Sequence, residues 1–323
     1  RYSVFRPNTN VRDAIESIFP EIEEGTKASL NPVNLVALTT LATPKLVIER
    51  DHLATQIETY QYLIKRLHPE PPYFISSLSP KEIMDRVEEL GLLQTEETDF
   101  GAVVHHDEFT AVLMTWYKNN VVHTLALPSL IACLLINRRR GISADQIPRM
   151  VERVYPYLCE ELSCDPADID QALAVMLDRG LICQDADGVL RPPSPSEADH
   201  RQLALLAKLV SQNLERMYIV IQQLAIEPSS REALRRAAQQ LAKRISRVYG
   251  INAPEFFDLR LFDAFIDGMI RRGIVSADEE GLLTYDNSLK DVLRAAEFVI
   301  EPQIRYGVLA SANGSSAEAA PSA

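Results

Sequence analysis

The chain has 323 residues, of which 46% are hydrophobic and 24% are charged, and this composition is ordinary for a globular protein. Its length is sufficient for two or three structural units. The net charge of −12 argues against nonspecific binding of nucleic acid, because phosphates need a positive surface on their partner.

The first thirty residues indicate a connector. Pro7, Pro20 and Gly25 divide them into short segments, with one short helix expected at Val11–Ile18. The chain starts with Arg1 rather than Met and shows no signal-peptide pattern. A start of this kind fits a fragment of a longer protein, with an upstream domain before the connector.

Two helices are expected next. Pro32 suits a first helical turn, and an apolar helix follows it to near Pro44. A second helix runs from about Glu49 to His68, where prolines end it. Its apolar residues recur in steps of three and four, as Leu53, Ile57, Tyr60, Ile64 and Leu67.

A pattern of a helix, a glycine and two short apolar runs then recurs three times. In each copy the glycine stands where the end of a helix favours a positive φ, and an acidic turn separates the two runs. A helix followed by a small β-hairpin is the winged-helix pattern. The glycines are Gly91, Gly180 and Gly273, and the turns are at 98–101, 185–188 and 278–281.

Winged-helix proteins often bind DNA through basic side chains, but acidic turns would repel phosphates. Packing within the protein or contact with another protein is therefore favoured over DNA binding. The acidic residues of the turns are Glu96, Glu97, Asp99, Asp185, Asp187, Asp278, Glu279 and Glu280.

The expected fold is mainly α, with multi-helical layers and three small β-hairpins in winged-helix-like units. The expected regions are a connector at 1–30, a helical region with the first hairpin unit at 31–140, a second winged-helix-like unit at 141–200, a helical region with the third hairpin unit at 201–310, and a disordered tail at 311–323.

The stretch from Ala111 to Leu130 is nearly uncharged and contains Trp116, the only tryptophan. It predicts a buried helix within a longer helical segment, Glu108 to Asn137, that is broken or kinked at Pro128. A compact polar patch in such a helix is either a hydrogen-bonded part of the core or a site. The patch consists of Tyr117, Lys118, Asn119, Asn120 and His123.

These polar residues, followed by Pro128, resemble a motif in the C-terminal region of bacterial membrane-bound glycerol-3-phosphate 1-O-acyltransferases. The family usually has Arg where this chain has Lys118. A second similar segment, GINAPEFFD at 250–258, is unusual enough to be fairly specific, and a weaker one is NPVNL at 31–35. The resemblance extends from about residue 30 to about residue 305.

The resemblance implies an enzyme that transfers an acyl chain from acyl carrier protein or acyl-CoA to the 1-hydroxyl of glycerol 3-phosphate, the first step of phospholipid synthesis. It also implies a peripheral location at the cytoplasmic face of the bacterial inner membrane. Such enzymes use a His and an Asp five positions apart, in which the His is a general base. None of the six histidines here has Asp at that distance, so no catalytic residue is assigned in this chain and it is expected to be inactive alone.

This region would then support the missing catalytic half of the enzyme. The two more specific segments are the candidate interface with that half: Tyr117, Lys118, Asn119, Asn120, His123, Asn252, Pro254, Glu255, Phe256, Phe257 and Asp258. The alternative is a standalone helical scaffold with winged-helix-like interaction modules and no enzymatic activity. An upstream reading frame that encodes the His–Asp motif would favour the first interpretation, and a start codon near Arg1 the second.

A basic amphipathic helix is expected at 229–248, and an arginine cluster follows the apolar segment. Such a helix lies either on an anionic bilayer or against the protein with a solvated basic face. The candidate contacts to a lipid headgroup or a partner are Arg138, Arg139, Arg140, Arg235, Arg236, Lys243 and Arg247.

No window is long and apolar enough for a spanning helix, so the sequence predicts none. The four cysteines contain no CxxC pair and are expected to be reduced thiols in a cytosolic compartment. His105 and His106 would point to opposite faces of a strand, so they do not predict a metal site. No cofactor is expected.

Overall fold

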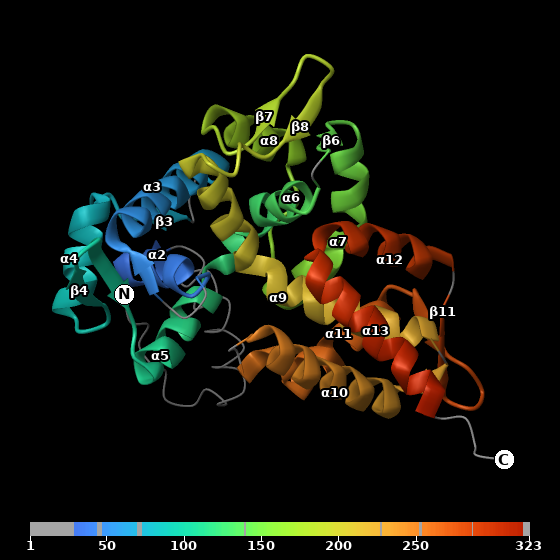
Figure 1. Cartoon of the computed structure of the whole chain (residues 1–323). Coiled ribbons are helices and arrows are strands. Elements are labelled where there is room, and N and C mark those ends of the chain that lie inside the picture. The colour runs from blue at the N-terminus through green and yellow to red at the C-terminus, as the bar shows by residue number, and fades with distance from the viewer. Residues whose placement is uncertain are drawn as a thin grey trace, which may run out of the picture. The chain divides into compact units, whose positions relative to one another are not determined.

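Helices dominate the described chain, and the strands between them are short (Figure 1). The computed structural model describes residues 29–43, 47–69, 73–138, 140–226, 228–251, 254–285 and 287–318. The chain forms two compact units, one ending at Val121 and the other beginning at Val122, a boundary inside the expected region 31–140. Nearly all of the expected connector at 1–30, including its helix, lies outside the described residues. The mainly α fold with small hairpins is confirmed.

The first unit is organised around the helix Pro32–Thr40, labelled α2. In chain order its described elements are β1 (Ser29–Leu30), α2, β2 (Val47–Glu49), α3 (Arg50–Leu67), β3 (Phe74–Ile75), α4 (Pro80–Glu89), β4 (Gln94–Thr98), β5 (Gly101–His105) and α5 (Glu108–Asn119). Residues 33–40 are all buried, and α3, α4 and α5 pack around them. A helix whose residues are buried on every face belongs at the centre of its unit.

The second unit is organised around α6 (Ala126–Ile136), which is buried from Ala126 to Leu135 and packs along α9 (Ala198–Ile226). Both helices are visible in Figure 1. The other described elements are η2 (Val122–Leu125), β6 (Ile142–Ser143), α7 (Gln146–Leu162), α8 (Ile169–Asp178), β7 (Cys183–Gln184), β8 (Val189–Arg191), β9 (Ser229–Ser230), α10 (Arg231–Tyr249), η3 (Pro254–Phe257), α11 (Leu259–Arg271), β10 (Val275–Ala277), β11 (Leu282–Tyr285), α12 (Asn287–Val299) and α13 (Pro302–Glu318).

The three predicted hairpins are present, and each gains a third strand that the sequence did not predict. The sheets have the strand orders β2-β5-β4, β6-β8-β7 and β9-β11-β10, and all their pairs are antiparallel. Apart from β3 and the 3₁₀ turn η3, the same order of helix, strand, two helices and hairpin occurs three times. The glycine after the second helix of each pair has φ of 70°, 79° and 70°, at Gly91, Gly180 and Gly273. This repeated order is that of a winged helix.

The segment 108–137 differs from its prediction. The prediction of a buried helical segment broken or kinked at Pro128 is wrong in the place of the break, because α5 ends at Asn119 and the 3₁₀ turn η2 precedes α6. Pro128 lies in the first turn of α6, where its missing N–H would have had no intrahelical partner. No single described helix is long and apolar enough to cross a bilayer. The helical segments Glu108–Asn119 and Val122–Ile136 are long and apolar enough only when taken together, and they are bent by 63° at the break between them.

The C-terminal segment also differs from its prediction. Helix α13 continues through Ser311 to Glu318, where a disordered tail was expected from residue 311. Alanines at 310, 312 and 317 favour a helix, which explains how a small and polar segment can extend one. The last five residues lie outside the described part.

Candidate functional site

The segment 117–120 of the polar patch lies at the end of α5, and its position is fixed from α2. The side-chain Nδ2 of Asn34 donates a hydrogen bond of 2.9 Å to the main-chain oxygen of Tyr117. Asn34 is 3% exposed, and its Oδ1 accepts from the main-chain N of Asn31, which closes the capping box of α2. The weak NPVNL match and residues 117–120 are therefore parts of one arrangement in the first unit.

The face of α5 that leads to this patch is exposed and apolar, which overturns the expectation of a buried helix. Phe109, Val112, Leu113 and Trp116 are 85%, 70%, 39% and 59% exposed, and their spacing places them on one face. Only Thr110 and Met114 of α5 are buried. We name these four exposed residues the α5 stripe.

The structure does not bring the whole polar patch together within one unit. Tyr117, Lys118 and Asn120 are half-buried and Asn119 is exposed, all in the first unit. His123 lies in η2 of the second unit, half-buried. Trp116 meets the ring of Tyr117 edge to face, with centroids 5.1 Å apart.

The segment 250–258 connects α10 to α11, and its described residues have local structural roles. Gly250 ends α10 with a φ of 67°, and Asp258 caps α11 by accepting from the main-chain N of Arg260 at 2.9 Å. An ion pair with Arg260 lowers the pKa of the Asp258 carboxyl. Phe256 is fully buried, and Phe257 accepts a hydrogen bond at its main-chain oxygen from Gln239.

The remaining candidate residues of this segment are Asn252, Pro254 and Glu255. Asn252 and the side chain of Pro254 lie outside the described part of the chain. Glu255 is half-buried in η3 and belongs to the short turn that precedes Phe256. Among the candidate interface residues of this segment whose side chains the structure describes, Glu255, Phe257 and Asp258 are half-buried and partly open to a partner.

The basic helix α10 divides into two halves with different surroundings. In its first half, Arg235 lies 2.8 Å from Asp263 and 2.6 Å from Glu232, and Arg236 lies 2.6 Å from Glu232. In its second half, Lys243, Arg244 and Arg247 are exposed. They line a shallow depression of about 330 Å³ together with Gln240 and Val248. The second half is thus the part of α10 with cations available to an external anion.

The arginine cluster after α6 is only partly described. The guanidinium of Arg138 lies 3.8 Å from the ring centroid of Phe298, and burial lowers its pKa. Arg140 is exposed, and Arg139 lies outside the described residues. Arg138 therefore already has a packing role within the second unit.

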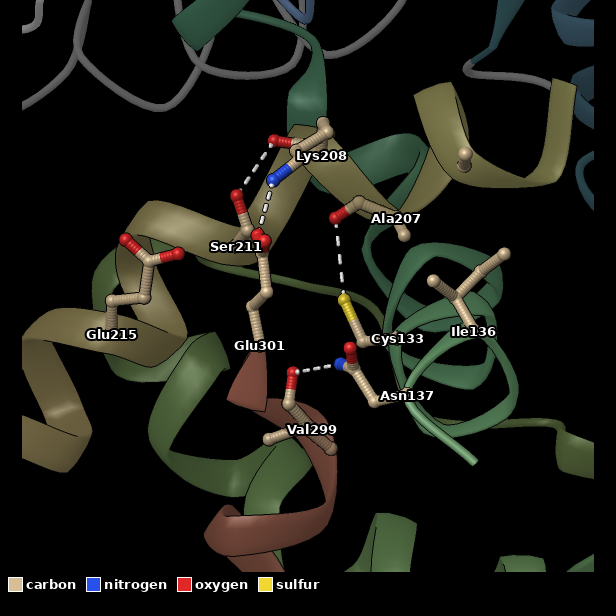
Figure 2. Close-up of a pocket in the computed structure, with 10 residues that line it drawn as sticks. Cys133, Ile136, Asn137, Ala207, Lys208, Ser211, Glu215, Val299 and Glu301 are labelled. Atoms are coloured by element: carbon tan, nitrogen blue, oxygen red, sulfur yellow. Dashed lines mark hydrogen bonds and ion pairs between the residues drawn. The ribbon is translucent and has the colours of Figure 1, made fainter. Parts of the chain in front are cut away.

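The second unit contains a pocket that no sequence pattern indicated. It has a volume of about 330 Å³ and is formed by α6, α9 and the junction of α12 with α13 (Figure 2). We name it the α6–α9 pocket. Its lining residues are Cys133, Ile136, Asn137, Ala204, Ala207, Lys208, Ser211, Glu215, Val299 and Glu301.

Most polar groups of this pocket are paired with one another. Lys208 forms an ion pair of 2.9 Å with Glu301. The Cys133 thiol donates to the main-chain oxygen of Ala207 at 3.2 Å, and burial raises its pKa to about 12. The amide of Asn137 donates to the main-chain oxygen of Val299 at 3.0 Å. Figure 2 shows these three interactions side by side.

Glu215 is the exception in the α6–α9 pocket. It is 5% exposed, and its Oε2 is buried without a hydrogen-bond partner among the described residues. Burial raises the pKa of its carboxyl to about 7, although Lys208 acts in the opposite direction. The spacing of Lys208, Ser211 and Glu215 places them on one face of α9, but this face is opposite the apolar side chains of Leu206, Val210 and Leu214, so the sequence alone indicates a solvated face.

Within the described residues, no group of three or more His, Cys, Asp or Glu side chains is placed to hold a metal ion. His106, one of the two histidines considered for a metal, is buried, and its Nε2 lies 2.7 Å from the hydroxyl of Thr40. Burial lowers the pKa of His106, which favours its neutral form.

Comparison with known proteins agrees with these motifs. Residues 22–278 match the family described as the glycerol-3-phosphate acyltransferase C-terminal region. Proteins named glycerol-3-phosphate acyltransferase from Pseudomonas fluorescens SBW25, Pseudomonas aeruginosa UCBPP-PA14 and Pseudomonas putida KT2440 are 36%, 35% and 33% identical to the chain over 291 residues. Each alignment covers 87% of this chain and 34–35% of the relative. The chain therefore spans about a third of the length of these curated relatives.

Proposed function

This chain belongs to the glycerol-3-phosphate acyltransferase family, whose C-terminal region it matches, and from that premise we propose that it is a non-catalytic support for acyl transfer. The reaction transfers an acyl chain from acyl carrier protein or acyl-CoA to the sn-1 hydroxyl of glycerol 3-phosphate. The chemistry is carried out by the part of the longer enzyme outside this region. In this region no histidine has Asp five positions later, so it is inactive alone.

The observation that carries this proposal is the exposed α5 stripe. Four large apolar side chains on one helix face form a surface that favours a partner, because contact removes them from water. The stripe leads directly to the Tyr117–Asn120 segment that resembles the family motif. We assign its partner as the catalytic part of the same enzyme, since the relatives are about three times as long as their aligned portion.

Charge favours this partner over an anionic bilayer for the first unit. Asp107 caps α5, Glu108 is its first residue, and exposed Glu96 and Glu97 lie on strand β4 of the same unit. Anionic lipid headgroups would be repelled by such a surface. A protein surface with apolar side chains at its centre and basic side chains at its rim complements it.

Substitution of Trp116 tests this contact. The catalytic part and this region are expressed as separate chains, and their association is measured by calorimetry with the wild type, Trp116→Ser or Phe100→Ser. Phe100 is the matched control, because it is fully exposed on the turn between β4 and β5 but outside the stripe. We expect Trp116→Ser to weaken association at least tenfold and Phe100→Ser to leave it unchanged. Equal association of the two variants would contradict the assignment.

A second contact, with an anionic membrane surface, is supported by the second half of α10. Lys243, Arg244 and Arg247 are exposed cations beside Val248, which is 64% exposed. Cations next to an apolar side chain suit the surface of an anionic bilayer. This contact would hold the region at the cytoplasmic face of the bacterial inner membrane as a peripheral component.

Vesicle sedimentation tests the membrane contact. Binding should require anionic lipid, weaken at high salt and be lost in a Lys243→Gln, Arg244→Gln, Arg247→Gln variant. A control variant with Arg231→Gln and Arg236→Gln removes cations that are paired with carboxylates in the structure. Loss of vesicle binding in both variants alike would show that only the total charge matters and would remove α10 as a specific surface.

A further inference from the structure

The α6–α9 pocket lies entirely within the second unit. None of its lining residues belongs to the α5 stripe or to the second half of α10. Its wall combines apolar side chains from Ile136, Ala204 and Val299 with a few polar groups. A concave, mostly apolar site with a small number of polar groups is the usual form of a binding site for small molecules. Its volume of about 330 Å³ suits a small ligand.

The charges in the pocket select the class of ligand. Lys208 and Glu301 neutralise one another in their ion pair, and Cys133 remains a neutral thiol because burial raises its pKa. Glu215 Oε2 has no hydrogen-bond partner among the described residues, and the two cations that act on its carboxyl, Lys208 and Arg216, already form ion pairs with Glu301 and Glu161. When it is ionised, the pocket carries one net negative charge, which excludes carboxylates and phosphates and favours a cation.

The hydrogen-bonding capacity of Glu215 points in the same direction. An ionised carboxylate only accepts hydrogen bonds, and a buried oxygen without a donor is costly. An ammonium group supplies both a positive charge and several N–H donors. In Figure 2 the Glu215 carboxyl stands apart from the paired groups, with no interaction drawn to it.

We propose that the α6–α9 pocket binds a small primary ammonium compound, whose charged head donates to Glu215 and whose short apolar tail lies against the apolar wall. The inference does not depend on the proposed support function, because it concerns a pocket within the second unit alone. The ammonium head supplies hydrogen-bond donors to the buried Glu215 carboxylate, and the apolar tail fills the rest of the pocket. Ligand binding should therefore stabilise this unit.

Three small molecules of matched shape test the inference on the full chain. Butylammonium, butanol and butyrate have similar tails and differ in their head groups. We expect calorimetry at pH 8 to show butylammonium binding at least tenfold more tightly than butanol, with no binding of butyrate. Binding of butylammonium should weaken as the pH falls below 7, because protonation of Glu215 removes its charge. Equal binding of the three molecules, or no binding of any, would overturn the inference.

Two variants and one control locate the site. Glu215→Gln keeps the shape of the side chain and should weaken butylammonium binding at least tenfold. Ala204→Leu fills the pocket and should reduce binding while Glu215 is retained. Glu197→Gln, an exposed carboxylate just before α9, should leave binding unchanged. Unchanged affinity in both Glu215→Gln and Ala204→Leu would place any ammonium binding elsewhere.

Discussion

The side chain of Asn34 donates a 2.9 Å hydrogen bond to the main-chain oxygen of Tyr117, and this bond joins two segments 83 residues apart. Asn34 also accepts from Asn31 and so belongs to the capping box of the buried helix α2. One nearly buried amide thus joins the start of the central helix to the end of α5. It holds the end of α5, which follows the exposed α5 stripe in the chain, against the start of α2.

Replacing Asn34 should therefore destabilise the first unit. Asn34→Ala removes the donor to Tyr117 and half of the capping box, and we expect a loss of about 1–3 kcal/mol in the free energy of unfolding. Urea unfolding measures it. Asn119→Ala, at an exposed position of the same patch, is the control and should change stability by less than about 0.5 kcal/mol. Equal losses of stability in the two variants would mean that the hydrogen bond from the Asn34 side chain to Tyr117 has no special role.

Glu215 should make stability depend on pH in the direction opposite to an ordinary carboxylate. Its pKa is raised from 4.5 to about 7 by burial, so the folded chain holds this proton more tightly than the unfolded chain. Stability from this group is fully present below pH 4.5 and is lost as the pH rises to about 7, by at most about 3 kcal/mol. Above pH 7 the contribution is constant.

Urea unfolding at pH 5, 6, 7 and 8 measures this effect through the difference between the wild type and Glu215→Gln. The other titrating groups occur in both proteins and largely cancel. The variant should gain stability relative to the wild type as the pH rises. A difference that is constant from pH 5 to pH 8 would show that Glu215 does not titrate in this range.

Two glycines with positive φ should differ in their response to substitution. Gly273 has φ of 70° with open space at the position of a Cβ, so Gly273→Ala should cost about 1 kcal/mol from the backbone alone. Gly141 has φ of 75°, and a Cβ there would lie 2.6 Å from the main-chain oxygen of Leu190. Gly141→Ala should cost at least twice as much, because the β6–β8 pair must move. Equal costs by thermal unfolding would contradict the role of this close approach.

Much of the fold could be predicted from the sequence because its signals are local. Gly180 and the acidic turn that follows mark a helix end and a hairpin without reference to distant residues. The third strands could not be found in this way. Strands β6 and β9 have two residues each, and their place in a sheet is set only by pairing with a distant strand.

The candidate sites were harder to predict, since they depend on which groups meet. Phe109 and Trp116 follow helical spacing, but spacing does not say whether an apolar face is covered. From the sequence alone, Arg235 is expected to be available to an external anion. In the structure it forms an ion pair with Asp263 on α11. Glu215 gave no signal, because it shares a helix face with Lys208 and Ser211 opposite the apolar side chains of α9, and such a face is normally solvated.

The most direct test of the central proposal is reconstitution of acyl transfer from two chains. The catalytic part of the enzyme is assayed with glycerol 3-phosphate and acyl-CoA, alone and with this region added. We predict low activity for the catalytic part alone, no activity for this region alone, and recovery when the two are combined. Full activity of the catalytic part without this region would contradict the proposed support function.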